Sequence, residues 1–249
     1  MPMRDLTELT DVEEPAWPLL SEAISTSRVS LEVLPVEPAQ ARASLLQLQV
    51  TARSWLGAFV LNCGGVSLDS GWLRIYGSPG GGSPKGPPGI ADVNEFPDRF
   101  DPVWRPDGGL VVGHDVLGGT YALNGPEPGA VGRPGGPGEV LYFAPDALRW
   151  EALGVGHAAW LSWLLEGGAE EFYDNLRWPG WRAETGPLPG SQGITFDPVL
   201  WSADARRDLP AARRRALHMT ELLDLHRDVG LELDKIDPGF LGNFHPGET

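Results

Sequence analysis

The chain has 249 residues and a formal net charge of −15 at pH 7, and so acidic a protein repels phosphate backbones, which disfavours a nucleic-acid binder. No apolar run approaches the roughly 20 residues that cross a bilayer, and the acidic N-terminus lacks the apolar centre of a signal peptide, so we expect a cytoplasmic protein without membrane contact. The single cysteine, Cys63, excludes an internal disulfide framework and a zinc site built from cysteines.

The N-terminal third is predicted to be mainly helical. A first helix should follow Pro15 and Pro18, because proline suits the first turn of a helix but disrupts its interior. The alternation of apolar and polar residues over 29–34 indicates a short strand. Pro38 then opens a second helix, which the spacing of alanines and leucines extends to about residue 51.

The region from Gly57 to Glu151 is typical of an antiparallel sheet built from hairpins. Apolar runs of strand length alternate with Gly, Asn-Gly, Asp-Ser-Gly and Pro-rich breaks, which are turn signals. These runs predict strands at residues 57–62, 66–68, 72–76, 110–113, 120–123, 139–143 and 148–153. Two Gly- and Pro-rich loops, 77–89 and 125–138, interrupt the sheet, and a short helix is expected at 91–100.

Helical periodicity returns after Gly156 and predicts helices at 158–165 and 169–176. Residues 178–201 lack this periodicity but hold several large aromatic rings, so we expect a packed loop. Beyond Asp204 the leucines share one helical face. We therefore predict one domain over residues 1–202 and a helical C-terminal extension over residues 203–249 that packs on it.

Several motifs are similar to those of a known bacterial family. They are WLRIYGS, HDVLGGTYALNG, GEVLYFAPDALRWEALGVGHAAWLSWLLEG and FYDNLRWPGW. On these motifs the chain resembles the DUF2625 proteins, bacterial proteins of unknown function, over about Leu6 to Trp201. More distantly, the order of the predicted elements is similar to that of the SUKH superfamily.

Together with the strand pattern, this resemblance implies a SUKH-like α+β fold, in which an antiparallel sheet of about five or six strands is flanked by helices. It also implies a binding function, because SUKH proteins are mostly non-catalytic binders. Many bacterial members look like immunity proteins that neutralise toxins. The two long loops and the C-terminal extension depart from the SUKH pattern.

The candidates for a binding surface are five residues: Trp72, Asp115, Tyr121, Trp178 and Trp181. Tryptophan and tyrosine are enriched where partners bind, and the segment from Trp178 to Trp181 is expected on a loop. Core packing is the alternative for these rings. Asp115 stands at a strand end beside His114, where it can act with that histidine as a base or can cap the following turn.

No catalytic residue set, metal site or cofactor site is predicted. The five histidines lack the i, i+4 spacing of a helical zinc pair, and Cys63 is expected to be a buried small residue. Acidic side chains crowd residues 166–174, where two carboxylates could hydrolyse a sugar or form a solvated face.

We therefore expect a non-enzymatic protein-binding module, of the immunity or antitoxin type, whose partner is a basic protein such as a toxin. An acidic inhibitor would gain association rate toward a basic partner through electrostatic steering. Two alternatives remain. One is a small hydrolase that uses strand-end carboxylates such as Asp69, Asp115 or Asp146, and the other is a structural homodimer.

Overall fold

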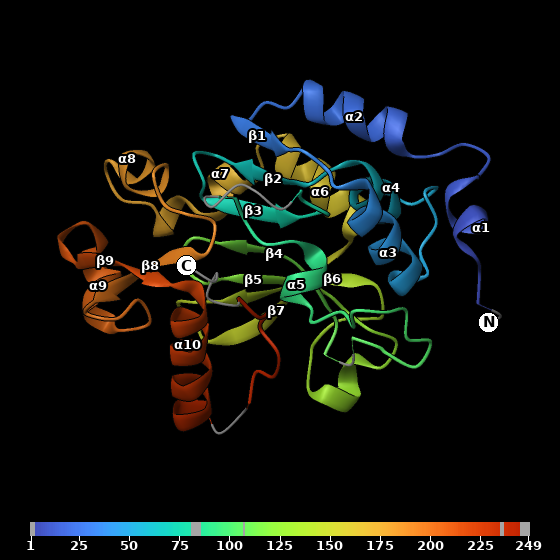
Figure 1. The fold of residues 1–249 in the computed structure, drawn as a ribbon. Helices are drawn as coiled ribbons and strands as arrows, with labels where there is room; N and C mark the ends of the chain where they lie inside the picture. The colour runs from blue at the N-terminus through green and yellow to red at the C-terminus, as the bar shows by residue number, and fades with distance from the viewer. Residues whose placement is uncertain (1–2, 81–85, 107, 235–236, 245–249) are drawn as a thin grey trace.

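The computed structural model describes residues 3–80, 86–106, 108–234 and 237–244. Within these ranges the chain forms a seven-stranded antiparallel sheet, a separate two-stranded sheet, and helices that pack around them (Figure 1). The predicted α+β class with a central antiparallel sheet is therefore confirmed, and the sheet is larger than the five or six strands expected. None of the helices in these ranges is long and apolar enough to cross a membrane.

The central sheet is a meander in which each strand pairs with the next strand along the chain. Its strands are β1 (Leu31–Leu34), β2 (Gly65–Leu68), β3 (Leu73–Tyr76), β4 (Leu110–Asp115), β5 (Thr120–Leu123), β6 (Glu139–Ala144) and β7 (Arg149–Gly156). The β2–β3 turn runs through Asp69, Ser70 and Gly71, all with positive φ. Gly71 adopts this conformation at no steric cost, and a Cβ there would also lie only 3.2 Å from the Thr185 carbonyl oxygen.

The register of the sheet aligns five polar residues, which we call the polar row. Glu32, Ser67, Arg74, His114 and Thr120 are direct partners on β1 to β5 in turn. Directly opposed residues of an antiparallel pair project from the same face of the sheet. The polar row therefore runs across one face, over more than half of the strands.

The helices α2 (Trp17–Ser25), α4 (Trp55–Asn62) and α6 (His157–Leu165) contact one another, and α6 also contacts β6 and β7. The remaining α-helices are α1 (Leu6–Thr10), α3 (Pro38–Leu48), α5 (Ile90–Val93), α7 (Ala169–Phe172), α8 (Trp181–Thr185), α9 (Ala203–Arg207) and α10 (Met219–Asp234). Local sequence explains several starts: Asp5 forms a capping box with Glu8, and the Glu37 carboxylate caps α3 ahead of Pro38.

One predicted strand is wrong, because residues 57–62 belong to helix α4. The Ser54 hydroxyl accepts a hydrogen bond from the Gly57 amide at 3.0 Å and caps this helix. The run from Leu56 to Val60 is buried throughout. A helix that is apolar on every side shows no hydrophobic periodicity. Its sequence therefore cannot be distinguished from that of a buried strand.

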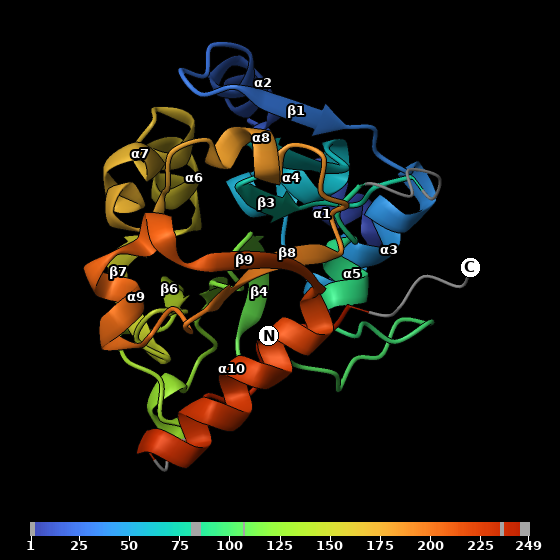
Figure 2. The same ribbon diagram turned by 90° about the vertical axis from the view of Figure 1, so that its left-hand side faces the viewer.

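The C-terminal part contains a hairpin as well as the predicted helix. Strand β8 (Gln192–Asp197) pairs with β9 (Arg213–His218), and α10 packs on both strands. Figure 2 shows the hairpin crossing the central sheet over β4, where the Ile194 amide donates to the Val116 carbonyl at 2.7 Å. Residues 192–197 were expected in a loop and residues 213–218 in a helix, and both expectations are wrong. The hairpin joins residues from both sides of the predicted boundary at residue 202.

The two Gly- and Pro-rich segments remain connections between elements. In the loop at 77–89, residues 81–85 lie outside the described part of the chain. The loop at 125–138 contains one 3-10 turn, η1 (Pro128–Val131). The helix expected at 91–100 is limited to the four residues of α5.

Candidate functional site

The five predicted binding residues lie close together, but in the core. Trp72, Asp115 and Tyr121 are fully buried, and Trp178 and Trp181 are 1% and 7% exposed. The Trp72 ring packs against the Trp178 and Trp181 rings, at centroid distances of 5.8 and 4.9 Å. Core packing, which the sequence left as the alternative, therefore describes these rings. A partner could reach them only if this part of the core opened.

Asp115 closes the β4–β5 turn. Its Oδ1 accepts hydrogen bonds from the Leu117 and Gly119 amides at 2.8 and 2.9 Å. Its Oδ2 accepts from the hydroxyls of Tyr142 and Tyr173 at 2.6 and 3.0 Å. Burial raises the pKa of Asp115, and these four hydrogen bonds oppose part of that rise. Every lone-pair direction of the carboxylate is occupied, as expected of a structural turn cap.

Tyr121 joins the same buried network through a 2.6 Å hydrogen bond between its hydroxyl and that of Tyr173. Tyr173 also packs edge-on against Trp72, at a centroid distance of 5.4 Å. Tyr173 thus connects the tryptophan group to the Asp115 carboxylate. The sequence did not single out Tyr173, although it lies in the motif FYDNLRWPGW.

His114 is held as a neutral ring. Its Nε2 donates to the Leu241 carbonyl at 2.6 Å, and its Nδ1 accepts from the Tyr76 hydroxyl at 2.7 Å. Burial lowers the pKa of His114 to about 3. Both ring nitrogens are used, and the C-terminal segment at Leu241 covers the ring, so His114 is not placed to act with Asp115 as a base.

The three aspartates proposed for a hydrolase have different hydrogen-bond and ion-pair partners. Asp69 forms ion pairs with Arg177 at 2.6 Å and Arg182 at 3.3 Å. Asp115 is enclosed by its own hydrogen bonds. Asp146 contributes its backbone carbonyl, which accepts from Arg206 at 2.7 Å. The Asp69 and Asp115 carboxylates are therefore each bound by structural partners, two arginines for Asp69 and two amides with two hydroxyls for Asp115.

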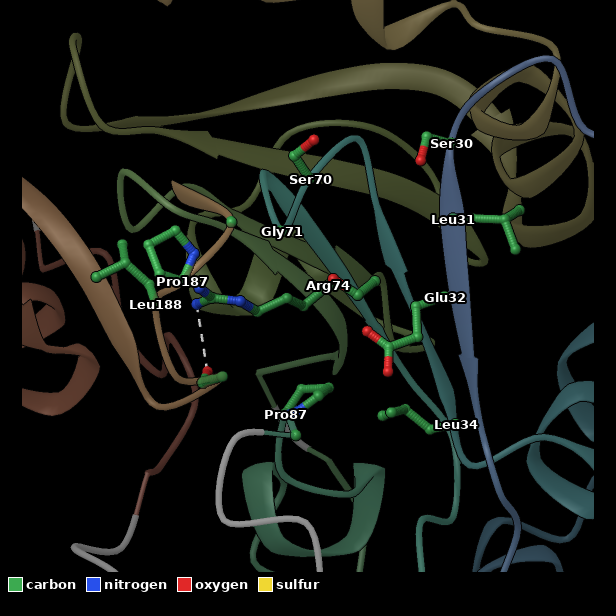
Figure 3. Close-up of a pocket in the computed structure, with 14 residues that line it drawn as sticks. Ser30, Leu31, Glu32, Leu34, Ser70, Gly71, Arg74, Pro87, Pro187 and Leu188 are labelled. Carbon is green, nitrogen blue, oxygen red and sulfur yellow. Dashed lines mark hydrogen bonds between the residues drawn. The ribbon is translucent and has the colours of Figure 1, made fainter. Parts of the chain in front are cut away.

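A pocket of about 430 Å³ lies at the β1 end of the polar row, and we call it the Arg74 pocket (Figure 3). Its floor comes from β1, β2 and β3, which supply Glu32, Ser67 and Arg74. One wall is the segment 186–190, and another is Gly86-Pro87 at the end of the long loop. The sequence did not predict this pocket.

Arg74 is the unusual residue of the pocket, because it is 2% exposed and has no carboxylate partner. Its Nη1 donates to the carbonyls of Gly190 and Gln192 at 3.2 and 2.6 Å, whereas its Nη2 has no hydrogen-bond partner. No acidic group in the described part of the chain lies within 4.0 Å of its guanidinium nitrogens. Burial lowers the pKa of Arg74.

The walls of the Arg74 pocket depend on glycine. A Cβ on Gly190 would collide with the backbone of Gly86 and Pro87, so the close approach of the two walls requires glycine there. The wall segment is also anchored by Arg74 itself, through the Gly190 carbonyl. Sequence reasoning could have noticed Arg74 because a charge interrupts the apolar strand Leu73–Tyr76, and arginine is seldom fully buried without a partner.

Comparison with known proteins gives a family but no activity. Residues 6–222 match the family model described as protein of unknown function DUF2625. The uncharacterized protein YbfG of Escherichia coli K12 is 37% identical over 225 residues, which cover 90% of this chain and 95% of YbfG. An uncharacterized protein of Haemophilus influenzae Rd is 35% identical over 198 residues, covering 80% of this chain and 83% of its own. No solved structure matches. The chain therefore belongs to the DUF2625 family.

Proposed function

We propose that this protein is a binding module whose recognition site is the Arg74 pocket and whose ligand carries an anionic group. The observation that supports this is the buried guanidinium with a free Nη2. Two carbonyls satisfy Nη1 and the nearby Asp115 carboxylate favours the charged guanidinium, but Nη2 keeps no hydrogen bond, which is costly for a buried charged group and which an incoming anion would supply. The planar guanidinium also matches carboxylate and phosphate oxygens, which makes arginine the common choice for such groups.

The size and lining of the pocket support a small ligand. About 430 Å³ is within the usual range for small-molecule sites. The hydroxyls of Ser30, Ser67 and Ser70 line it alongside Arg74 and can hydrogen-bond to further oxygens of the ligand. The residues of the floor lie on strands, which hold them in fixed positions without a ligand.

Calorimetric titration of the protein with acetate, phosphate and sulfate tests this function. We expect at least one of these anions to bind, and Arg74→Gln to weaken that binding about tenfold or more, since hydrogen bonds to charged groups contribute about 1.5–3 kcal/mol. Arg74→Lys should retain part of the affinity, because the charge remains but the fork geometry is lost.

Arg42→Gln is the matched control, because Arg42 is an exposed arginine on α3 and its loss changes the net charge equally. Circular dichroism establishes that each variant is folded. Equal binding by Arg74→Gln and Arg42→Gln, or no binding of any anion by the folded wild-type protein, would contradict the proposed function.

A second candidate is a basic protein partner, in keeping with an immunity or antitoxin role in the cytoplasm. The observation that favours it is the net charge of −15. Opposite net charges raise the association rate, and the gain falls steeply as salt increases.

The partner candidate is tested by capture from the host lysate at low salt, followed by association kinetics with the purified partner. Between 50 and 500 mM salt we expect the association rate to fall by about tenfold or more, because screening shortens the range of the steering field. An association rate that does not change with salt would remove electrostatic steering from this candidate.

A further inference from the structure

We propose that the ligand of the Arg74 pocket is a small zwitterion whose anionic and cationic ends are separated by a short apolar linker. Its carboxylate binds the Arg74 guanidinium, and its ammonium binds the Glu32 carboxylate. This inference rests on the proposed function, which requires the anionic end alone.

The charges of the pocket are the first step of the argument. Among the described residues that line the pocket, Arg74 and Glu32 are the two that carry charge. They have opposite signs, yet no ion pair within 4.0 Å joins them or pairs either with another described residue. Figure 3 shows the Arg74 side chain reaching toward Pro187 and Leu188, while the Glu32 carboxylate stays on the β1 side. The pocket therefore offers two separate and opposite charges.

The spacing of the strands sets the length of the ligand. Glu32 and Arg74 occupy the same register position on β1 and β3, with Ser67 on β2 between them. Two strand spacings separate their backbones by roughly 10 Å. Each ionic contact takes up about 3 Å, which would leave roughly 4 Å if both charges lay directly above their backbones. Figure 3 shows the Arg74 side chain extending away from β1 toward Pro187 and Leu188, so the gap is longer, and we take a chain of about four methylenes to span it. An α-amino acid is too short to reach both groups.

The uncharged lining fits such a linker. Leu31, Leu34 and Leu188 line the pocket together with Pro87 and Pro187. Ser67 lies between the two charged positions and presents a neutral hydroxyl rather than a third charge. Methylene groups that cross from Arg74 to Glu32 would therefore meet carbon atoms and one hydroxyl.

The two ends should contribute unequally. Arg74 is buried, so its contact with a carboxylate is shielded from water, whereas Glu32 is exposed and its contact with an ammonium is screened. The anionic end therefore provides most of the affinity, and the cationic end provides selectivity among anions of similar size.

Calorimetric titration with 5-aminopentanoate and pentanoate tests this inference, because the two compounds share a five-carbon chain and differ in the amino group. We expect wild-type protein to bind 5-aminopentanoate about threefold to fivefold more tightly than pentanoate. Glu32→Gln should bring the ratio of the two affinities to about one, because the ammonium then has no carboxylate to bind. Glu171→Gln, an exposed glutamate on α7, is the matched control and should keep the preference.

The possible results distinguish the zwitterion inference from the anion-binding function on which it rests. If pentanoate binds and the amino group adds nothing, or if the preference survives in Glu32→Gln, the zwitterion is overturned while the anion site stands. If neither compound binds and acetate, phosphate and sulfate also fail, the proposed function itself is overturned. Loss of both compounds in Arg74→Gln, together with a preference that needs Glu32, supports both.

Discussion

At the scale of single residues, two buried charged groups on neighbouring strands differ in how completely they are hydrogen-bonded. The Asp115 carboxylate receives four hydrogen bonds, from two amides and two tyrosine hydroxyls. The Arg74 guanidinium keeps an unpaired Nη2 beside a pocket. A buried polar group with all its hydrogen bonds made stabilises the folded structure. A buried group with a hydrogen bond unmade marks a place where a ligand can supply that bond.

The role of Asp115 can be measured with two substitutions. Asp115→Ala leaves four donors without an acceptor and should lower the free energy of unfolding by about 3 kcal/mol or more. Asp115→Asn keeps one oxygen for the two amides and offers an amino group to the two tyrosine hydroxyls, so it should cost about 1 kcal/mol. Urea unfolding followed by circular dichroism gives both values, and equal losses in the two variants would contradict the turn-cap role.

The residue scale also shows what sequence can and cannot predict about a site. The turn cap at Asp115 could be predicted, because it depends on a local pattern, an acid followed three and four residues later by two glycines. The Arg74 pocket could not, because its lining comes from β1 to β3, Gly86-Pro87 and residues 186–190. Segments so far apart in the chain leave no local pattern, and only the fold brings them together.

At the scale of elements, turn residues predicted the secondary structure better than apolar runs did. The strands from β2 to β7 follow glycine and proline signals that the sequence displays directly, and their order is the order of the chain. Helix α4 was missed because its residues are apolar on every side. Strand β9 was missed because Arg213-Arg214-Arg215 shows no alternation of apolar and polar residues. The strand forms by pairing with β8, a contact between segments that are separated in sequence.

At the scale of the whole molecule, three histidines make stability depend on pH. Burial lowers the pKa of His114 to about 3 and the pKa values of His157 and His226 to about 4. In the unfolded chain each ring takes up a proton near pH 6.5. Between about pH 6.5 and pH 4 the unfolded state therefore binds more protons than the folded state, and the free energy of unfolding falls as the pH falls.

Each of these histidines adds at most about 1.4 kcal/mol per pH unit, near the middle of that window, so the three together reach at most about 4 kcal/mol per unit. Asp115 acts in the opposite direction, since burial raises its pKa, and a variant is therefore more decisive than the wild-type stability curve.

His157→Phe removes one titrating ring whose Nδ1 has no hydrogen-bond partner. Urea unfolding at pH 7, 6 and 5 should show that the variant loses about 0.7 kcal/mol less than the wild type between pH 7 and 6, and about 1.2 kcal/mol less between pH 6 and 5. An unchanged pH dependence would mean that His157 is already protonated in the folded protein, or is accessible enough to become so, and would contradict its burial as a neutral ring at the start of α6.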